Sequence, residues 1–435
     1  MTLLGPVLVE PGTFDLLNLG DVAMLQVAVE RLRAIAPSAE LRVFTRDPEA
    51  LREHCPDALP LSAEARRQWF AERFFLGRVH DLIPDAASRR LVHAKHDMRR
   101  RYPRLMNSAM RLRARIRNPG WQNMRAFLDL MSSAGMVVIA GQHTIADAFQ
   151  SRSHMLLATL EAALQRGIPT AMLGQGIGPL TDRELIARAR AVLPAVDLIA
   201  VREPHLGPPV LRALGVSDAR VVLTGDDAVA PAFAASAHAT RESLGVSLRV
   251  TPVAGVETAV IERMRSPLRE FAAAHGVSTI PLPSAYHGIA ADELTLRQLL
   301  GDQIDAAVGD WDVRTVPALI DNVGRCRIVV AGAYHVAVFA LSQGIPVVAV
   351  AQSNYYRSKY DGLETLFGSG CETVTLNDPE LEVHLRDAME RAWERADELR
   401  PRLLEAAGRQ VRWGEAAFAS AMAAATPTQA SPRAG

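Results

Sequence analysis

The sequence predicts an α/β protein made of two Rossmann-like domains with parallel sheets, and three observations support this prediction. Short β-branched runs alternate with longer helical patterns, which is typical of parallel sheets covered by helices. The alternation starts again after about residue 240, so the chain contains two such series. The length of 435 residues also fits two domains at roughly 100–200 residues each.

The first domain is expected over residues 1–235. A helix is predicted over Asp21–Arg33, where apolar residues recur on one helical face. The predicted strands of this domain are Pro6–Glu10, Leu41–Phe44, Met136–Ala140, Thr170–Leu173, Asp197–Val201 and Arg220–Leu223.

The second domain is expected over residues 240–377, after a boundary in the small-residue stretch Ala230–Thr240. Helices are predicted over 378–421, either beside this domain or running back over the first. The tail 426–435 is rich in Pro, Ala, Ser and Thr and is predicted to be disordered. The predicted strands of the second domain are Ser247–Val253, Ser278–Leu282, Ile328–Ala331 and Val347–Ala351.

One segment, about 64–128, interrupts the alternation and is predicted to be a helical insertion. Its part Arg89–Arg117 holds 11 basic residues and one acidic residue, Asp97. One interpretation is a solvated helical surface. The other is a basic surface that receives an anionic acceptor, a phosphate-bearing carrier or a membrane headgroup. Nucleic acid ranks third, because no nucleic-acid motif accompanies the charge.

Composition narrows the function classes. The 48 basic and 48 acidic residues cancel, so the net charge gives no nucleic-acid signal. The three cysteines are too far apart for a zinc spacing or a disulfide framework, so no metal site is expected and a reducing compartment fits best. The most apolar window, Ile328–Leu341, is too short to span a bilayer, and the first residues carry no secretion signal. We therefore expect a cytoplasmic protein.

Candidate functional residues stand where strands end, because ligands of open parallel sheets bind there. The first candidate is the loop from Asn18 to Asp21, directly before the first long helix. Gly20 lets the chain turn sharply, and Asn18 or Asp21 can cap the helix. The loop is either a plain helix cap or a cleft-facing segment in which Asp21 binds a hydroxyl or acts as a base.

Two glycine-containing segments follow later strands. In Ala140–Asp147, Gly141 permits a close backbone approach, and His143 is either a structural hydrogen-bonding group or a cleft residue. The segment Gly174–Pro179 holds three glycines in five residues. We expect it to form a loop whose amides can face a ligand, although it matches neither a P-loop nor a dinucleotide fingerprint.

Charged residues also end two strands of the first domain. Arg202 points either at the cleft or at a neighbouring carboxylate. Asp226, in the sequence Gly225-Asp-Asp227, belongs to a pair of acids that suits base chemistry, metal ligation or helix capping.

The most informative segment is Gly332–Pro346. A predicted strand ends at Ala331 and a helix starts near Tyr334, which puts His335 in the first helical turn. The positive end of a helix disfavours protonated histidine, and a bound anion would reverse that preference. The next segment, Asn354–Gly362, supplies Tyr355, Tyr356, Arg357 and Lys359, either as site residues or as plain surface. Lys359 is one of only two lysines in the chain.

Taken in order, these segments resemble the polysaccharide pyruvyl transferase family. The resemblance covers about residues 5–370 without the helical insertion. The segments that carry it are Asn18–Asp21, Ala140–Asp147, Gly174–Leu180, Arg202-Glu203 with Leu211–Val216, His335–Leu341, and Tyr355–Gly362.

This resemblance implies a GT-B-like fold, in which two Rossmann-like domains face a cleft. It also implies transfer of a pyruvyl group from phosphoenolpyruvate to a sugar, forming a ketal across two hydroxyls. Phosphoenolpyruvate is then a co-substrate, and no cofactor is needed. The expected acceptor is a glycan, a lipid-linked sugar or a glycosylated small molecule.

The resemblance also implies roles for individual residues. His335 would be the acid or a phosphate contact, and Asp21 would orient an acceptor hydroxyl. The implied donor-binding residues are Arg202, Gly174, Gln175, Gly176, Gly178, Arg357 and Lys359. The implied acceptor or cleft residues are Asn18, Gly20, Gly141, His143, Asp226, Tyr355 and Tyr356.

The sequence departs from the family pattern at Ala333, where the family usually has an arginine two residues before the histidine. Its absence removes an anion contact unless Arg357 or Lys359 replaces it. Two other functions therefore stay open. One is a group transferase of the same fold that uses a nucleotide sugar or another activated donor. The other is a binding protein that kept the fold without the chemistry.

Overall fold

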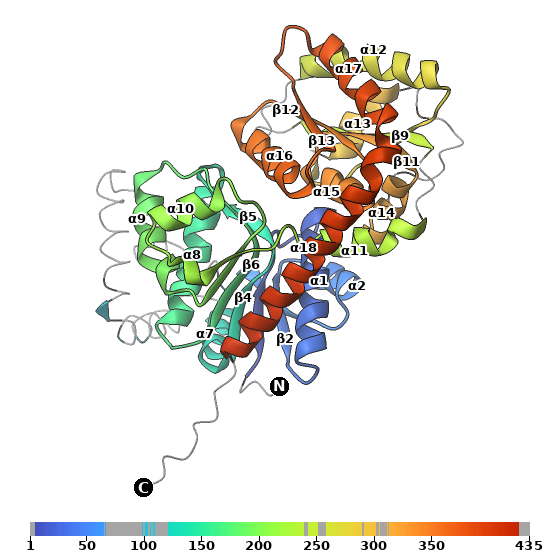
Figure 1. Ribbon diagram of the computed structural model, residues 1–435. Helices are drawn as coiled ribbons and strands as arrows, with labels where there is room; N and C mark the ends of the chain where they lie inside the picture. The colour runs from blue at the N-terminus through green and yellow to red at the C-terminus, as the bar shows by residue number, and fades with distance from the viewer. Residues whose placement is uncertain are drawn as a thin grey trace.

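A computed structural model describes residues 5–64, 66, 98, 101, 102, 105, 108, 121–238, 242–250, 258–288, 291–301, 304, 311 and 313–425. The predicted tail 426–435 and most of the predicted basic insertion, including most of Arg89–Arg117, lie outside these residues. The described chain forms two α/β domains with a parallel sheet in each, as predicted (Figure 1). In the part of the chain that the structure describes, no helix is both long enough and apolar enough to cross a bilayer.

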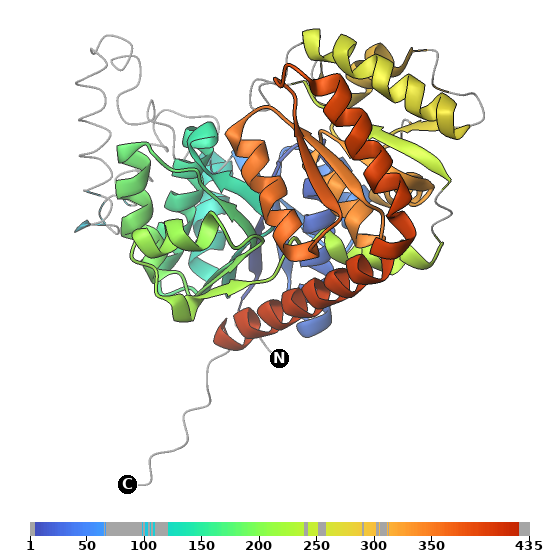
Figure 2. The ribbon, with the colours of Figure 1, turned by 45° about the horizontal axis from the view of Figure 1, so that its top comes forward.

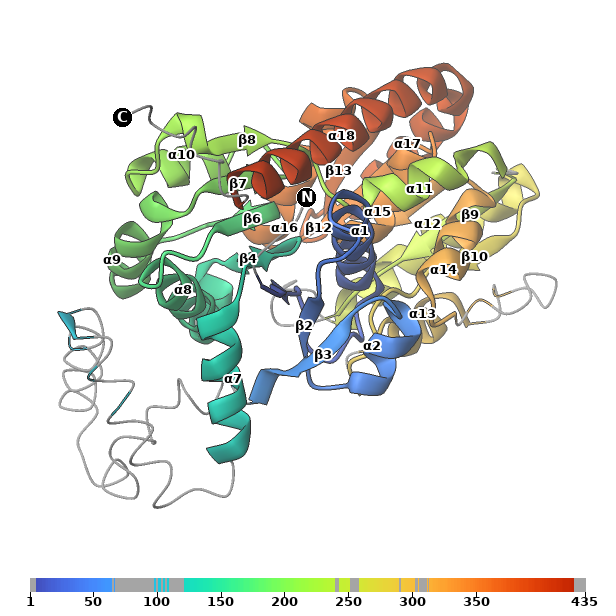
Figure 3. The ribbon, with the colours of Figure 1, turned by 90° about the horizontal axis from the view of Figure 1, so that it is seen from below.

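The first domain contains an eight-stranded parallel sheet in the order β3-β2-β1-β4-β6-β7-β8, with β5 paired to β6. Helices cover both faces (Figure 3). Its strands are β1 (Val7–Glu10), β2 (Leu41–Thr45), β3 (Leu59–Ser62), β4 (Met136–Ile139), β5 (Gln142–Ile145), β6 (Thr170–Ile177), β7 (Leu198–Val201) and β8 (Val221–Leu223). Its helices are α1 (Leu19–Ile35), α2 (Pro48–His54), α7 (Trp121–Ser133), α8 (Gln150–Leu164), α9 (Arg183–Val192) and α10 (Gly207–Ala213).

The central strand β1 shows how the two faces of this sheet are built. Its side chains alternate, so that Leu8 joins the core under α8 and α9, whereas Val7 and Val9 join the core under α1. All three side chains are fully buried. The core under α1 also continues into the second domain, where it includes Leu244 and Val330.

The second domain contains a five-stranded parallel sheet in the order β10-β9-β11-β12-β13. Its strands are β9 (Ser243–Ser247), β10 (Thr279–Pro281), β11 (Cys326–Ala331), β12 (Val347–Ala351) and β13 (Cys371–Thr375). Its helices are α12 (Thr258–His275), α13 (Asp292–Leu300), α14 (Val316–Gly324), α15 (Tyr334–Ser342), α16 (Asn354–Phe367) and α17 (Leu381–Glu394).

Two helices connect the domains. The described part of the predicted boundary Ala230–Thr240 is helical, because α11 (Val229–Ala235) and a 3-10 helix (Ser236–His238) occupy it. The helix α11 packs against α14 and α15. The last helix, α18 (Ala396–Ala425), packs against α15 and α16 and also against α1 and β6 of the first domain. In Figure 2 this helix runs along both domains.

The predicted strand Ser247–Val253 is wrong, because the strand β9 ends at Ser247. Its middle residue is Gly245, which has low β-propensity and conceals the strand in the sequence. The structure needs glycine there, since a Cβ atom would lie 2.7 Å from Sγ of Cys326 on the neighbouring strand.

Candidate active site

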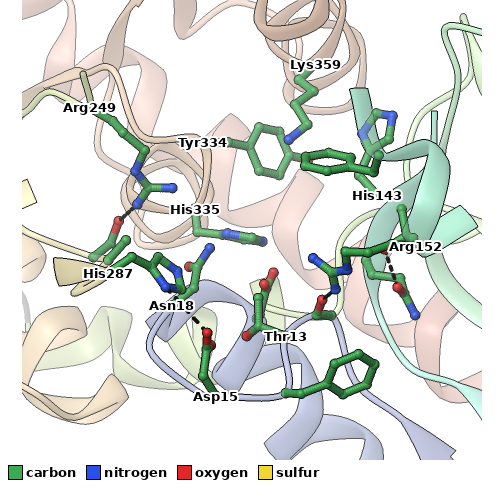
Figure 4. A pocket seen from close by; sticks show the side chains of 18 of the residues that line it. Thr13, Asp15, Asn18, His143, Arg152, Arg249, His287, Tyr334, His335 and Lys359 are labelled. Atoms are coloured by element: carbon green, nitrogen blue, oxygen red, sulfur yellow. Dashed lines mark hydrogen bonds and ion pairs between the residues drawn. The ribbon is translucent and has the colours of Figure 1, made fainter. Parts of the chain in front are cut away.

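A cavity of about 400 Å³ lies between the two sheets, at the carboxyl ends of their strands. Figure 4 shows side chains from both domains converging on it. Residues predicted from the sequence that line this cavity are Asn18, Asp21, His143, Arg202, His335, Tyr355, Tyr356 and Lys359.

The two domains are joined by backbone hydrogen bonds at the edge of the cavity. Asn18 forms an antiparallel bridge with Ala285. The amide of Leu19 donates to the carbonyl of Ser284 at 2.8 Å. The side chain of Asn18 also accepts from the amide of Gly20 and thereby caps α1. The loop therefore caps α1 and also faces the cavity.

His335 occupies the first turn of α15 and reaches toward the first domain. It packs directly over Gly20, where a Cβ atom would overlap the imidazole. Its Nε2 lies 3.8 Å from a carboxylate oxygen of Asp226, and this nitrogen is buried without a hydrogen-bond partner. A buried polar atom that faces a cavity without a partner is available to a ligand.

Burial lowers the pKa of His335 well below its usual value. The charges of Arg202, Lys359 and Arg249 lower that pKa further. His335 is therefore neutral in the free protein at neutral pH. An anion bound among the three cations would offset their effect and favour the protonated imidazole.

Arg202 follows β7 and is held rigidly by its neighbours. It donates to Asp226 at 3.0 Å and to Nδ1 of His143 at 3.2 Å, and its guanidinium lies 4.5 Å from the centre of the Tyr334 ring. Because a guanidinium only donates and a carbonyl only accepts, His143 is the neutral tautomer with its proton on Nε2, bonded to the carbonyl of Gly178. His143 thus orients Arg202, and Asp226 does so without lining the cavity.

Lys359 enters the cavity from α16. Its ammonium lies 4.4 Å from the ring centre of Tyr355, 5.0 Å from that of Tyr334 and 5.2 Å from that of Tyr356. Among the described residues no carboxylate forms an ion pair with it. Burial lowers the pKa of Lys359 well below its usual value, and the charge of Arg202 lowers it further. This cation would gain most from an anionic ligand.

Asp21 faces the same space from the first turn of α1. Its carboxylate lies over Gly12, where a Cβ atom would be 2.8 Å from the carboxyl carbon. Burial raises the pKa of Asp21, and the charge of Arg152 lowers it. A carboxylate with a raised pKa is a better proton acceptor than an exposed one.

Arg249 is a site residue that the sequence prediction missed. It follows β9, the strand whose position was predicted wrongly, so its place at a strand end was hidden. It donates to both carboxylate oxygens of Asp292 at 2.8 Å and to the hydroxyl of Ser284 at 2.9 Å. Asp292 is fully buried, so the pair fixes the guanidinium at the cavity wall.

The prediction of a glycine loop over Gly174–Pro179 is wrong, because most of this segment is a strand. Gly174, Gln175 and Gly176 lie inside the buried strand β6, which continues to Ile177, and Gly178 follows it. None of the four lines the cavity. The glycines instead make room for side chains, because a Cβ atom at Gly174 would lie 2.5 Å from Oδ2 of Asp227 and one at Gly176 would overlap His143.

Other predicted residues also lie outside the cavity lining. Gly141 packs against Met24, where a Cβ atom would overlap the sulfur. Arg357 is exposed and donates to the Asn354 side chain at 2.8 Å, so the expectation that it faces the site is wrong. The part of the chain that the structure describes contains no cluster of three potential metal ligands.

Comparison with known protein families assigns the chain to one of them. The sequence profile of the polysaccharide pyruvyl transferase family matches residues 18–354. The chain belongs to this family. The matched span contains the lining residues from Asn18 to His335, from both domains.

Solved structures place this pyruvyl transferase family member among GT-B folds. It is similar to a UDP-GlcNAc 2-epimerase from Neisseria meningitidis bound to UDP-GlcNAc, with 10% identity and a TM-score of 0.58 over 96% of this chain and 100% of that one. It is also similar to a glycosyltransferase from Rickettsia africae, with 9% identity and a TM-score of 0.52 over 96% and 99% of the two chains. At these identities the similarity establishes the fold. No curated protein matches the sequence.

Ala333 precedes α15 as its N-cap residue and is 1% exposed. It contributes no charge to this pyruvyl transferase family site. Lys359 and Arg249 both face the cavity near His335, and their charges act on that imidazole.

Proposed function

We propose that this protein transfers a pyruvyl group from phosphoenolpyruvate to two hydroxyls of a sugar. The observation that carries the proposal is the group of three cations, Arg202, Arg249 and Lys359, around the unpartnered nitrogen of His335. Phosphoenolpyruvate carries a phosphate and a carboxylate on one small carbon frame. Two guanidiniums and an ammonium suit those two anions.

The proposed reaction requires specific proton transfers and bond changes. The methylene carbon gains one proton, two new C–O bonds form at the neighbouring carbon, and the bond from that carbon to the phosphate oxygen breaks. The two sugar hydroxyls lose two protons. One balances the proton that the methylene carbon gains, and the other leaves with the phosphate.

Residues of both domains suit these steps. Donor binding among the cations favours protonation of His335, which then delivers its proton to the methylene carbon. Asp21, on the opposite domain, accepts the proton of the attacking hydroxyl. Arg202, fixed by Asp226 and His143, binds the donor carboxylate or phosphate without having to reorganise.

The expected acceptor is a glycan precursor, a lipid-linked sugar or a glycosylated small molecule. The second candidate donor is a nucleotide sugar. Three aromatic residues that line the cavity, Phe14, Phe149 and Tyr355, favour it because their rings suit stacking on a nucleotide base. Both donors are anionic, so direct binding measurements separate them.

A thermal-shift titration with phosphoenolpyruvate and UDP-GlcNAc tests the proposal. We expect saturable stabilisation by phosphoenolpyruvate alone, of about 2.7 kcal/mol at a hundredfold excess over Kd. Release of inorganic phosphate that depends on an added sugar would then show transfer. His335→Ala should keep the fold and lose turnover. Arg212→Gln changes an exposed arginine of α10 that does not line the cavity, and it should behave like the wild type. Stabilisation by UDP-GlcNAc alone would refute the proposed donor.

A further inference from the structure

A second cationic group lies in the same cavity, around the ring of Phe14. Three guanidiniums surround this ring: Arg66 at 4.8 Å, Arg152 at 5.7 Å and Arg46 at 5.9 Å from its centre. Burial lowers the pKa of Arg66, and the charges of Arg152 and Arg46 lower it further, which shows how closely the three lie together.

The three arginines differ in their partners. Arg66 is fully buried and forms an ion pair with Glu10, so its charge is neutralised inside the protein. Arg152 donates to the carbonyl of Gly12, and no carboxylate pairs with Arg152 or with Arg46 among the described residues. Arg46 and Arg152 both line the cavity, whereas Arg66 does not. Two guanidiniums that form no ion pair with a described carboxylate therefore face the cavity here.

This group is separate from the cations around His335. The charges that lower the pKa of His335 come from Arg202, Lys359 and Arg249, whereas Asp21 is influenced by these three and by Arg152. In Figure 4, Arg152 and Arg249 approach from opposite sides, with His335 between them.

Two carboxylates, those of Asp15 and Asp21, share the cavity but form no ion pair with Arg46 or Arg152. Asp15, on the same loop as Phe14, also lines the cavity, but its carboxylate lies 3.6 Å from Nδ1 of His287 and also accepts from the amide of Leu17. Asp21 lies between the two cationic groups and is influenced by both, since Arg152 and Lys359 each lower its pKa.

We propose that the acceptor sugar of this protein carries a phosphate group, which Arg46 and Arg152 bind at the Phe14 end of the cavity. This inference rests on the proposed function, because it assigns the other cationic group to the donor. A donor anion at one end and an acceptor phosphate at the other place the sugar hydroxyls beside Asp21 and His335. Phe14 packs against both guanidiniums and limits their motion.

The test is calorimetric titration of the full chain at saturating phosphoenolpyruvate. Methyl glucoside serves as the neutral probe, glucose 1-phosphate as a phosphate monoester and inorganic pyrophosphate as a diphosphate. We expect both phosphates to bind and methyl glucoside to bind at least tenfold more weakly. Arg46→Gln and Arg152→Gln should each weaken phosphate binding by roughly ten- to a hundredfold, the effect of losing a charge-assisted hydrogen bond. Tighter binding of pyrophosphate would identify a diphosphate-linked acceptor.

Two controls make the result specific. Arg212→Gln removes an exposed arginine outside the cavity and should leave every affinity unchanged. Arg46 is itself exposed, so Arg46→Gln should fold normally. Equal binding of methyl glucoside and glucose 1-phosphate would overturn the inference, as would unchanged phosphate binding in both variants. A large loss of phosphoenolpyruvate affinity in Arg46→Gln and Arg152→Gln would also overturn it, by assigning these arginines to the donor.

The same titrations separate the two proposals. If phosphoenolpyruvate does not bind to the wild-type protein, the proposed function fails. Glucose 1-phosphate titrated alone then still tests the acceptor subsite, since its binding either depends on Arg46 and Arg152 or does not.

Discussion

Gly20, at the start of α1 in the first domain, lies against the imidazole of His335 in the second. A Cβ atom at position 20 would overlap the ring. The glycine therefore lets the two domains approach closely enough for His335 and Asp21 to share one cavity.

Gly20→Ala should accordingly displace His335 and separate the two domains locally. We expect turnover to fall by at least tenfold, with a smaller loss of melting temperature. Gly408→Ala is the matched control, because a Cβ atom in that helical position would lie 3.4 Å from its nearest neighbour, an ordinary contact. Turnover of Gly20→Ala equal to that of the control would show that the close approach is not needed.

Donor binding should be accompanied by proton uptake. The pKa of His335 and that of Lys359 both lie well below their usual values in the free protein, and a bound anion raises both. At a pH between the free and bound values, the complex binds more protons than the free protein. Calorimetry with phosphoenolpyruvate in buffers of different ionisation enthalpy measures this uptake. His335→Ala should reduce it, and an unchanged uptake would remove His335 as the group that is protonated.

Arg202 and Arg357 were both predicted to bind the donor, but only Arg202 lines the cavity. Arg202→Gln should weaken phosphoenolpyruvate binding by roughly ten- to a hundredfold, because it removes a charge-assisted contact. Arg357→Gln should leave the affinity unchanged, since this side chain is exposed and bonds to Asn354. Equal losses in the two variants would contradict the placement of Arg357.

Asp227 should make stability depend on pH. It pairs with Arg31 at 2.7 Å, and burial raises the pKa of Asp227 to about 6, above the usual value of an aspartate. The pKa of Asp227 is higher in the folded protein than in the unfolded chain, so the folded state binds the proton more tightly. Its contribution to stability is therefore full below about pH 4 and is lost as the pH rises through about 6. The difference corresponds to roughly 3 kcal/mol in the free energy of unfolding.

Urea denaturation of wild type and Asp227→Asn at several pH values checks this prediction. The wild type should lose stability relative to the variant as the pH rises from about 4 to about 7. Asp218→Asn changes an exposed aspartate and should reproduce the wild-type profile. A constant difference between wild type and Asp227→Asn would show that Asp227 titrates normally.

The sequence predicted most of the fold because its strands are apolar and its helices are amphipathic. It failed where a strand lacked that signal. β9 contains Gly245 between two serine ends, so its β-propensity is low although it is an interior strand, paired with β10 and β11. The edge strand β13 is half exposed and was not predicted at all.

The site was partly predictable for a related reason. His335 and Arg202 lie directly after clear strands, where parallel sheets place their ligands. Arg249 was missed because its strand was misplaced. Arg152 was missed because it projects from the first turn of α8 rather than from a strand end. Glycines in β6 look like a ligand loop in sequence, whereas their actual function is to accommodate Asp227 and His143.

The helix α18 couples the unfolding of the two domains. It contacts both domains, and one continuous apolar core includes residues of both sheets, from Val9 to Val330. We therefore expect neither half to fold independently, since a fragment ending at His238 would lack the helix that covers α1 and β6. We expect amide protons of both sheets to exchange through the same rare global opening, rather than domain by domain.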